Sequence, residues 1–297
     1  MTPRLSIVVC TFNRATWLRI CLESLVPQCV DASMVEVLIV DNNSTDDTTK
    51  VASEFTVPVP NFRYVFEQAQ GLSHARNRGF REARGDYVAY IDDDAKAHPD
   101  WVNAILQFIN AYPDVSGFGG QHRAFSLVPI PSWFPKEYGS RTMGEVTRPL
   151  QEGEWISGTN MVFKKSALSD VGGFNTSIGM TGTKVSYGEE VHLTLRMIER
   201  GMQIYYCAKM RVDHAIREDK LTLRWLLHSS FAGGYDAVTI LSYKGTAITF
   251  LPILARYGVH ACIALFINKE KHLKTRIYQS MAPFCRQLGH FVKLLGL

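Results

Sequence analysis

The 297-residue sequence has little net charge, no cysteine pair at metal-knuckle spacing and no glycine-rich phosphate loop. Its 32 Lys and Arg against 28 Asp and Glu leave a formal charge of +4, which is too weak to predict nucleic-acid binding. The 6 scattered cysteines are typical of reduced, buried thiols in the cytoplasm. The first apolar run is short and lacks the flanks of a signal peptide, so we expect no secretory leader.

The missing phosphate loop limits how the protein could bind a nucleotide. Neither G-x-x-x-x-G-K-[ST] nor G-x-G-x-x-G follows the first apolar run, Leu5–Cys10. A backbone cradle for phosphate is therefore not expected there, and a metal ion with side chains would have to neutralise any phosphate.

The composition supports a large buried core, with 46% apolar and 11% aromatic residues. Short β-branched runs, typical of strands buried on both faces, alternate with stretches of helical spacing. The predicted strands are 5–10, 35–40, 62–66 and 87–91, and the predicted helices are 15–25, one starting at Ser44 or Thr45, 73–83 and 101–111. This order predicts an α/β fold, with βαβ units on a mostly parallel, doubly wound sheet.

The pattern changes after residue 120. Residues 121–153 contain four prolines, with Trp133, Phe134 and Tyr138 between them, and are predicted to form a loop that acts as a lid or binds a partner. Regular spacing resumes at 155–163, a helix is predicted at 189–199 and a strand at 203–207, and the chain is predicted to be helical after Leu221. We therefore expect a domain at 1–220, with halves 1–120 and 121–220, and a helical extension at 221–297.

Three carboxylates, Asp92, Asp93 and Asp94, end the fourth predicted strand. Ligands of open α/β sheets bind at the carboxyl ends of the strands, and adjacent like charges need a cation among them. Mg²⁺ or Mn²⁺ shared with phosphate oxygens would satisfy them. The alternative is a solvated acidic turn that caps the helix after Pro99.

Polar residues also follow the first two strands, and a cation lies near the same edge. Thr11, Asn13 and Arg14 follow the first strand, and Asp41 follows the second. Because Ser44 or Thr45 is expected to cap the next helix, Asp41 would be free to accept hydrogen bonds from a base or ribose. Arg76 begins a predicted helix at this edge and could supply a positive charge to the ligand.

Four segments resemble the signature of family 2 glycosyltransferases of the GT-A fold: LSIVVCTFNR, LIVDNNSTDDT, GLSHARNRG and GDYVAYIDDDA. The resemblance covers residues 4–215 and implies a Rossmann-like nucleotide-diphospho-sugar transferase sheet flanked by helices. It implies that the nucleoside contacts Thr11, Asn13 and Asp41. It also implies that Asp92 contacts ribose and that Asp94 binds the metal on the diphosphate, with Asp93 between them.

A second acidic pair, Glu189 and Glu190, opens a predicted helix. Carboxylates are favoured at a helix N-terminus, so electrostatics alone could explain them. Sugar transfer with inversion needs a carboxylate to take the acceptor's proton. The resemblance implies that Glu190 is this base, although the family carries Asp there, and Glu189 stays open as the alternative.

Further candidate residues each have a structural alternative. The resemblance implies that His214 reaches the metal or the diphosphate, whereas a lone histidine is more often structural. It also implies that Gly158 and Asn160 approach the donor sugar, whereas the segment could be an ordinary turn before a strand. Trp133 in the proline-rich loop could contact the acceptor or merely anchor the loop.

The most apolar stretch is Thr246–Asn268, which contains Pro252, Arg256 and His260. An arginine at the centre of a spanning helix costs about 2.5–3.5 kcal/mol, so we expect this stretch not to span a membrane. Residues 246–297 contain seven Lys and Arg and one Glu beside an apolar face. This pattern predicts an interfacial helix on anionic lipid, the alternatives being a helical cap or a contact in a homodimer.

Together these features predict an inverting glycosyltransferase that uses Mn²⁺ or Mg²⁺ and a nucleotide-diphosphate sugar, with UDP favoured. The expected acceptor is a hydroxyl of a saccharide or polyprenyl-linked saccharide, in surface polysaccharide or glycoconjugate synthesis. The expected location is the inner face of the cell membrane, and no nucleic acid is expected. The alternatives are a sugar nucleotidyltransferase, although residues 11–17 contain no glycine for its phosphate loop, and a non-catalytic sugar-binding module.

Overall fold

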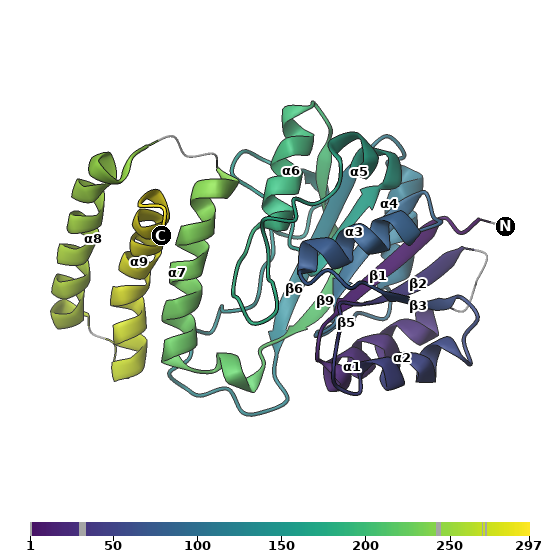
Figure 1. Ribbon diagram of the computed structural model, residues 1–297, viewed down its shortest axis with the longest axis horizontal. Helices are drawn as coiled ribbons and strands as arrows, with labels where there is room; N and C mark the ends of the chain where they lie inside the picture. The colour runs from purple at the N-terminus through teal and green to yellow at the C-terminus, as the bar shows by residue number, and fades with distance from the viewer. Residues whose placement is uncertain (1, 30–33, 242–244, 269, 271) are drawn as a thin grey trace. The chain divides into compact units, whose positions relative to one another are not determined.

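The computed structural model describes residues 2–29, 34–241, 245–268, 270 and 272–297 (Figure 1). Contacts within the chain divide it into two compact units. The first unit comprises Met1–Phe125, Gly139–Ser177 and Glu189–Ala215, and the second comprises Ser126–Tyr138, Ile178–Gly188 and Ile216–Leu297. The predicted division into a domain at 1–220, with halves that meet at residue 120, and an extension after residue 220 stays a prediction.

Four parallel strands form one half of the sheet in the first unit. They are β1 (Leu5–Thr11), β2 (Val35–Asp41), β3 (Phe62–Phe66) and β4 (Tyr87–Asp92), in the order β3-β2-β1-β4. β1 and β2 are buried on both faces because their side chains alternate between two hydrophobic clusters, one on each side of the sheet. The predicted parallel α/β half is therefore confirmed.

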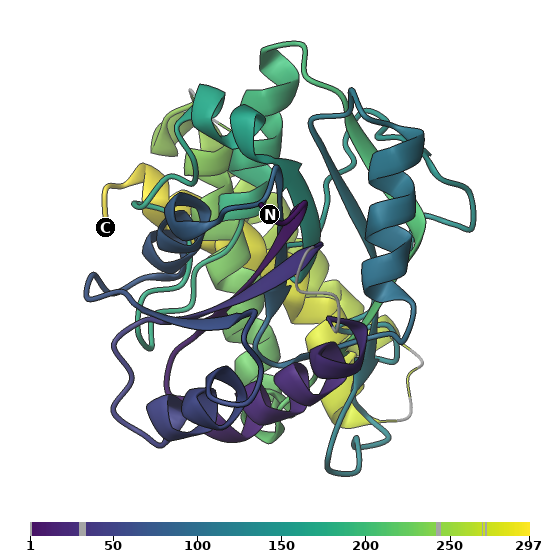
Figure 2. The same ribbon diagram turned by 90° about the vertical axis from the view of Figure 1, so that its right-hand side faces the viewer.

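Helices cover both faces of this sheet. α1 (Ala15–Leu25), α2 (Thr48–Thr56) and α4 (Trp101–Ala111) supply apolar side chains to one cluster, and α3 (Leu72–Glu82) supplies them to the other. In Figure 2, α4 lies on the right of the sheet and α3, in dark blue, on the left. A 3₁₀ turn, η1 (Val26–Gln28), extends α1.

The predicted start of α2 at Ser44 or Thr45 is wrong. α2 begins at Thr48, whose backbone N–H donates to the Asp46 carboxylate at 3.0 Å. Ser44 and Thr45 instead bond to Asn13 after β1. The polar residues between β2 and α2 therefore hold two neighbouring loops together.

The second half of the sheet is mixed. β8 (Asn160–Lys164) runs antiparallel between β4 and β6 (Gly117–Phe125), and β9 (Ile204–Ala215) runs parallel to β6. Two short strands, β5 (Ala95–Ala97) and β7 (Arg148–Pro149), pair antiparallel with β9. β9 is longer than predicted, since it extends to Ala215 and carries His214 within the strand. α5 (Lys165–Val171) and α6 (Glu189–Glu199) complete the first unit.

The second unit contains three long helices, which confirms the predicted helical C-terminal region. They are α7 (Leu223–Ile240), α8 (Ala247–Ile267) and α9 (Leu273–Leu294), after a 3₁₀ turn, η2 (Glu218–Lys220). α9 packs against both α7 and α8 (Figure 1). α8 continues through Pro252 and, in the described part of the chain, is the one helix long and apolar enough to cross a membrane by length and composition.

Candidate active site

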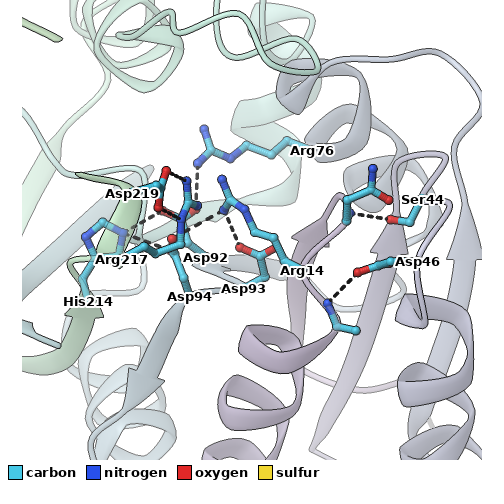
Figure 3. A network of polar contacts seen from close by, with 12 residues as sticks. Arg14, Ser44, Asp46, Arg76, Asp92, Asp93, Asp94, His214, Arg217 and Asp219 are labelled. Carbon is cyan, nitrogen blue, oxygen red and sulfur yellow. Dashed lines mark hydrogen bonds and ion pairs between the residues drawn. The ribbon is translucent and has the colours of Figure 1, made fainter. Parts of the chain in front are cut away.

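The acidic triplet at the end of β4 surrounds an arginine. Asp93 and Asp94 are buried, whereas the side chain of Asp92 is 29% exposed. Arg14, just before α1, places its Nη1 2.8 Å from Asp93 and 3.5 Å from Asp94 (Figure 3). Burial raises the pKa of Asp93 although Arg14 opposes the shift. The cation that the triplet requires is thus partly supplied by the chain itself.

Asp92, Asp94 and His214 lie together, with one ligand atom of each within 4.8 Å of the others. The pairing of β5 with β9 sets Ala95 beside His214, and His214 Nε2 lies 3.1 Å from Asp94 and 3.9 Å from Asp92. Two carboxylates with one imidazole are suitable ligands for Mn²⁺ and acceptable for Mg²⁺. The residues present therefore fit a divalent metal ion.

A second histidine, His122 on β6, lies beside this cluster. Its ring centre is 5.8 Å from that of His214, in an edge-to-face arrangement. Burial lowers the pKa of His122 to about 4, and His214 adds to the shift. The sequence analysis did not identify His122 as a site residue. It lies in β6, in a stretch that was predicted to be a loop.

Arg76 joins the two acidic clusters. Its buried guanidinium contacts Glu189 at 2.5 Å, Asp92 at 3.2 Å and the backbone carbonyl of Gly158 at 3.2 Å. Arg76 was predicted to begin a helix, and it lies in the second turn of α3, which starts at Leu72. Its charge, however, is engaged by protein oxygens, so Arg76 holds the site together in this structure.

Glu189 and Glu190 open α6 but have different surroundings. Glu189 is buried and paired with Arg76, whereas Glu190 is half-buried. Burial raises the pKa of Glu190 to about 8, and the neighbouring Glu189 charge adds to the shift. A carboxyl group with such a pKa exchanges its proton near neutral pH, as a general base requires.

Asp41 is not free, contrary to the prediction. It is buried, and its carboxylate accepts hydrogen bonds from the Ser44 backbone N–H at 2.9 Å and from the Tyr64 hydroxyl at 2.8 Å. The prediction failed because Asp41 accepts hydrogen bonds from neighbouring protein groups, whether or not Ser44 caps a helix. A nucleoside contact by Asp41 stays a prediction, since a carboxylate has about four acceptor positions.

Thr11 and Asn13 lie at the end of β1, where they were predicted. Thr11 is buried, and Asn13 has a left-handed backbone with φ of 51°. The side-chain oxygen of Asn13 accepts a hydrogen bond from the Thr45 backbone N–H at 2.7 Å. The backbone N–H of Asn13 donates to the Ser44 hydroxyl at 2.9 Å. These bonds order the loop beside the acidic triplet.

Asn160 has a packing role in this structure, and its contact with the donor sugar stays a prediction. Its side chain is fully buried. Its amide oxygen accepts from Trp101 Nε1 at 2.7 Å, and its amide nitrogen donates to the carbonyls of Gln121 at 2.8 Å and Met210 at 3.0 Å. The side chain thus ties α4, β6 and β9 together, whereas Gly158 keeps its place beside Arg76.

Trp133 belongs to the second unit. Its carbonyl accepts from the Thr275 hydroxyl at 2.6 Å, and Lys274 Nζ lies 5.0 Å from the centre of its ring. These contacts attach the proline-rich loop to α9, as the alternative interpretation expected. A contact of Trp133 with an acceptor stays a prediction.

Comparison with known proteins identifies the class. The model of "Glycosyl transferase family 2" matches residues 6–172, more than half of the chain, and the protein therefore belongs to this family of glycosyltransferases. The resemblance of the four sequence segments is confirmed by this match.

Two relatives align over most of the chain. The glucosyl-dolichyl phosphate glucuronosyltransferase of Haloferax volcanii is 28% identical over 242 residues, covering 78% of this chain and 76% of the relative. The GalNAc(5)-diNAcBac-PP-undecaprenol beta-1,3-glucosyltransferase of Campylobacter jejuni is 27% identical over 232 residues, covering 74% and 68%.

Solved structures share the fold. The mannosyltransferase PcManGT from Pyrobaculum calidifontis, in complex with GDP-Man and Mn²⁺, aligns with a TM-score of 0.65 at 18% identity and covers 99% of this chain and 88% of that chain. Staphylococcus aureus TarS 1-349 in complex with UDP-GlcNAc aligns with a TM-score of 0.60 at 17% identity, covering 96% and 72%. The predicted GT-A fold, with its C-terminal helices, is therefore confirmed.

Proposed function

We propose that this glycosyltransferase moves a hexosyl group, with inversion and with a divalent metal, from a nucleotide-diphosphate sugar to a saccharide hydroxyl. The observation that carries the proposal is the position of Arg76, which contacts both Asp92 and Glu189. Arg76 thus links the cluster suited to hold a metal and diphosphate to Glu189, the sequence neighbour of the proposed base, Glu190.

Asp92, Asp94 and His214 would hold Mn²⁺ or Mg²⁺, and the ion supplies positive charge that stabilises the departing diphosphate. Their donor set supports this assignment, and so does the Mn²⁺ in the complex of PcManGT. Arg14 would contact the same diphosphate from the other side of the triplet, since it already pairs with Asp93 and Asp94.

Glu190 would accept the proton of the acceptor hydroxyl as that oxygen attacks the anomeric carbon. Its raised pKa, about 8, supports this role, because the carboxylate then has a substantial affinity for the proton. Glu189 would position the site through its ion pair with Arg76 and is the second candidate for the base.

Thr11, Asn13 and Asp41 would contact the nucleoside. We favour UDP as the nucleotide, while the two structural neighbours carry UDP-GlcNAc and GDP-Man. Gly158 would lie near the donor sugar. Its lack of a side chain leaves room for the Arg76 guanidinium, which fixes its carbonyl.

The acceptor would be a saccharide or a polyprenyl-linked saccharide at the inner face of the cell membrane. The names of the two aligned relatives contain dolichyl phosphate and PP-undecaprenol. In α8, Ile248 is 85% exposed and Phe266 is 88% exposed, and basic residues follow in the sequence. Such a surface suits the interface of an anionic bilayer. We place the enzyme in the synthesis of surface polysaccharide or glycoconjugate, where the acceptor would lie at the inner face of the cell membrane.

A screen of nucleotide sugars with Mn²⁺, by thermal shift and calorimetry, tests the proposal. We expect a UDP-sugar to raise the Tm of the wild-type protein only when Mn²⁺ is present, and Asp94→Asn to abolish this dependence. Asp114→Asn, at an exposed carboxylate outside the site, is the matched control and should behave as the wild type. Sugar transfer that survives Asp94→Asn unchanged would remove the metal role. Binding without transfer to any saccharide would favour a non-catalytic module.

A further inference from the structure

Trp155 is an exposed aromatic residue with one face covered by a cation. Its side chain is 40% exposed although it lies within the first unit, directly before the loop that contains Gly158. The Arg141 guanidinium lies 4.0 Å from the centre of the Trp155 ring and also donates to the Trp155 carbonyl at 3.1 Å. This cation–π contact holds the ring in one orientation, and the 40% exposure of Trp155 leaves part of the side chain accessible to a ligand.

The chain around Trp155 is held on both sides. The preceding residue, Glu154, makes a two-pronged ion pair with Arg148 at 2.6 and 2.7 Å and accepts the Gln151 N–H at 2.8 Å. These bonds lower the pKa of Glu154 to about 2. The following residue, Ile156, is fully buried. A binding surface that is ordered before the ligand arrives loses less entropy on binding.

Trp155 is connected to both acidic clusters. The Arg141 backbone exchanges two hydrogen bonds with His122, at 2.9 and 3.0 Å, and the His122 ring contacts His214. The Arg141 charge also interacts with Glu190. Every residue in this set belongs to the first unit, unlike Trp133, whose loop belongs to the second.

We propose that the free face of Trp155 stacks on a pyranose ring of the acceptor saccharide. One face of a pyranose carries mainly C–H groups, and an exposed indole offers a flat apolar surface of matching size. Arg141 lies against the other face of the ring, and the ion pair of Arg148 with Glu154, the residue before Trp155, supplies charged groups nearby that suit hydroxyls. The identification of the ring as an acceptor depends on the proposed function, whereas binding of a saccharide at Trp155 does not.

Saturation-transfer NMR on the full-length protein, without donor or metal, tests the binding. The probes are the methyl glycosides of glucose, galactose, mannose and N-acetylglucosamine. We expect at least one probe to bind, and we expect its ring protons to show the strongest saturation-transfer signals of that probe. Trp155→Ala should weaken its binding about tenfold, and Trp155→Phe should retain most of it. Trp225→Phe, a tryptophan of α7 in the second unit, is the matched control and should not change binding.

Wild-type saturation transfer in Trp155→Ala, or none of the four probes binding to the wild type, would overturn the inference. A melting curve for each variant separates loss of binding from loss of folding. Once an acceptor is known, Trp155→Ala should raise its KM about tenfold and leave the KM of the donor unchanged. Probe binding that requires Trp155 in a protein without transferase activity would refute the proposed function and leave this inference standing.

Discussion

Glu189 and Glu190 are sequence neighbours that the fold places in different electrostatic surroundings. Glu189 faces Arg76 and has its charge compensated. Glu190 is half-buried beside that charged pair, and its pKa rises to about 8. Removing one partner of a buried ion pair is more damaging than losing an exposed charge, because the remaining charge is left uncompensated. A substitution at Glu190 is therefore a cleaner test of chemistry than one at Glu189.

The rate of sugar transfer should rise with pH until Glu190 is ionised. A base acts in its deprotonated form, so kcat/KM should increase about tenfold per pH unit below about 8 and level off above it. Glu190→Gln should lower kcat by at least about 100-fold and abolish this dependence. Steady-state rates between pH 6 and 9 provide the measurement.

The matched control for this prediction is Glu199→Gln. Glu199 lies at the other end of α6, is exposed, and should have no effect on the rate. A wild-type rate in Glu190→Gln would move the role of base to Glu189.

At the scale of elements, strand pairing brings distant residues into the site. β9 passes beside β5 and β6, and this pairing sets His214 beside Asp94, which is 120 positions away in the sequence. The predicted strand ended at residue 207 because the following residues contain charged side chains that interrupt the apolar pattern. The sheet accommodates them because β9 alternates buried and exposed positions up to Ala215.

The close packing of α7 against α9 depends on glycines in both helices, Gly234 in α7 and Gly289 in α9. A Cβ at Gly234 would lie 1.8 Å from the backbone oxygen of Arg286 in α9, so the helices would have to separate. Gly234→Ala should lower the free energy of unfolding by about 1–3 kcal/mol. Denaturant unfolding provides the measurement.

The adjacent Gly233 is the matched control. A Cβ there would meet only the end of the Arg286 side chain, at 3.4 Å, and alanine favours helix. Gly233→Ala should be neutral or raise the free energy of unfolding by up to about 1 kcal/mol. Equal stability of the two variants would contradict the proposed packing.

At the scale of the whole molecule, the small net charge of +4 is unevenly distributed. Residues 246–297 hold seven Lys and Arg and one Glu, so the rest of the chain is mildly acidic. In α8 the apolar residues Ile248, Phe266 and Ile267 are 70% exposed or more. Exposed apolar area of this kind is uncommon unless a lipid surface or another protein covers it.

We expect the protein to bind vesicles that contain anionic lipid and to bind them less as salt increases. The double variant with Ile248→Ser and Phe266→Ser should lose most of this binding, because each side chain contributes its apolar area to the bilayer interface. Co-sedimentation with phosphatidylglycerol–phosphatidylcholine vesicles provides the measurement.

Val57→Ser is the matched control, because Val57 is 82% exposed in the first unit and should not contribute to vesicle binding. Equal binding by the double variant and the wild type would contradict the assignment to α8. It would leave the helical cap and the contact between two copies as the remaining interpretations.

Local patterns predicted most of the first half of the sheet. β3, α1 and α4 have the predicted bounds, because apolar periodicity is set by residues close together in the sequence. The predicted start of α2 was wrong because its polar side chains can form hydrogen bonds either with nearby residues or with residues distant in the sequence. Ser44 and Thr45 looked like helix caps, but both bond to Asn13, 31 and 32 positions away.

The sequence by itself determined the family, most of the order of strands and helices in the first half of the sheet, and the residues able to carry the chemistry. Only the tertiary structure decided how those residues are paired. Arg76 contacts Glu189, 113 positions away, and so separates the two candidate bases by their surroundings. The tertiary structure also placed Asn160 in the core and Trp155 at the surface. The physical reason is that charge compensation and burial depend on distances in space, which a linear pattern does not contain.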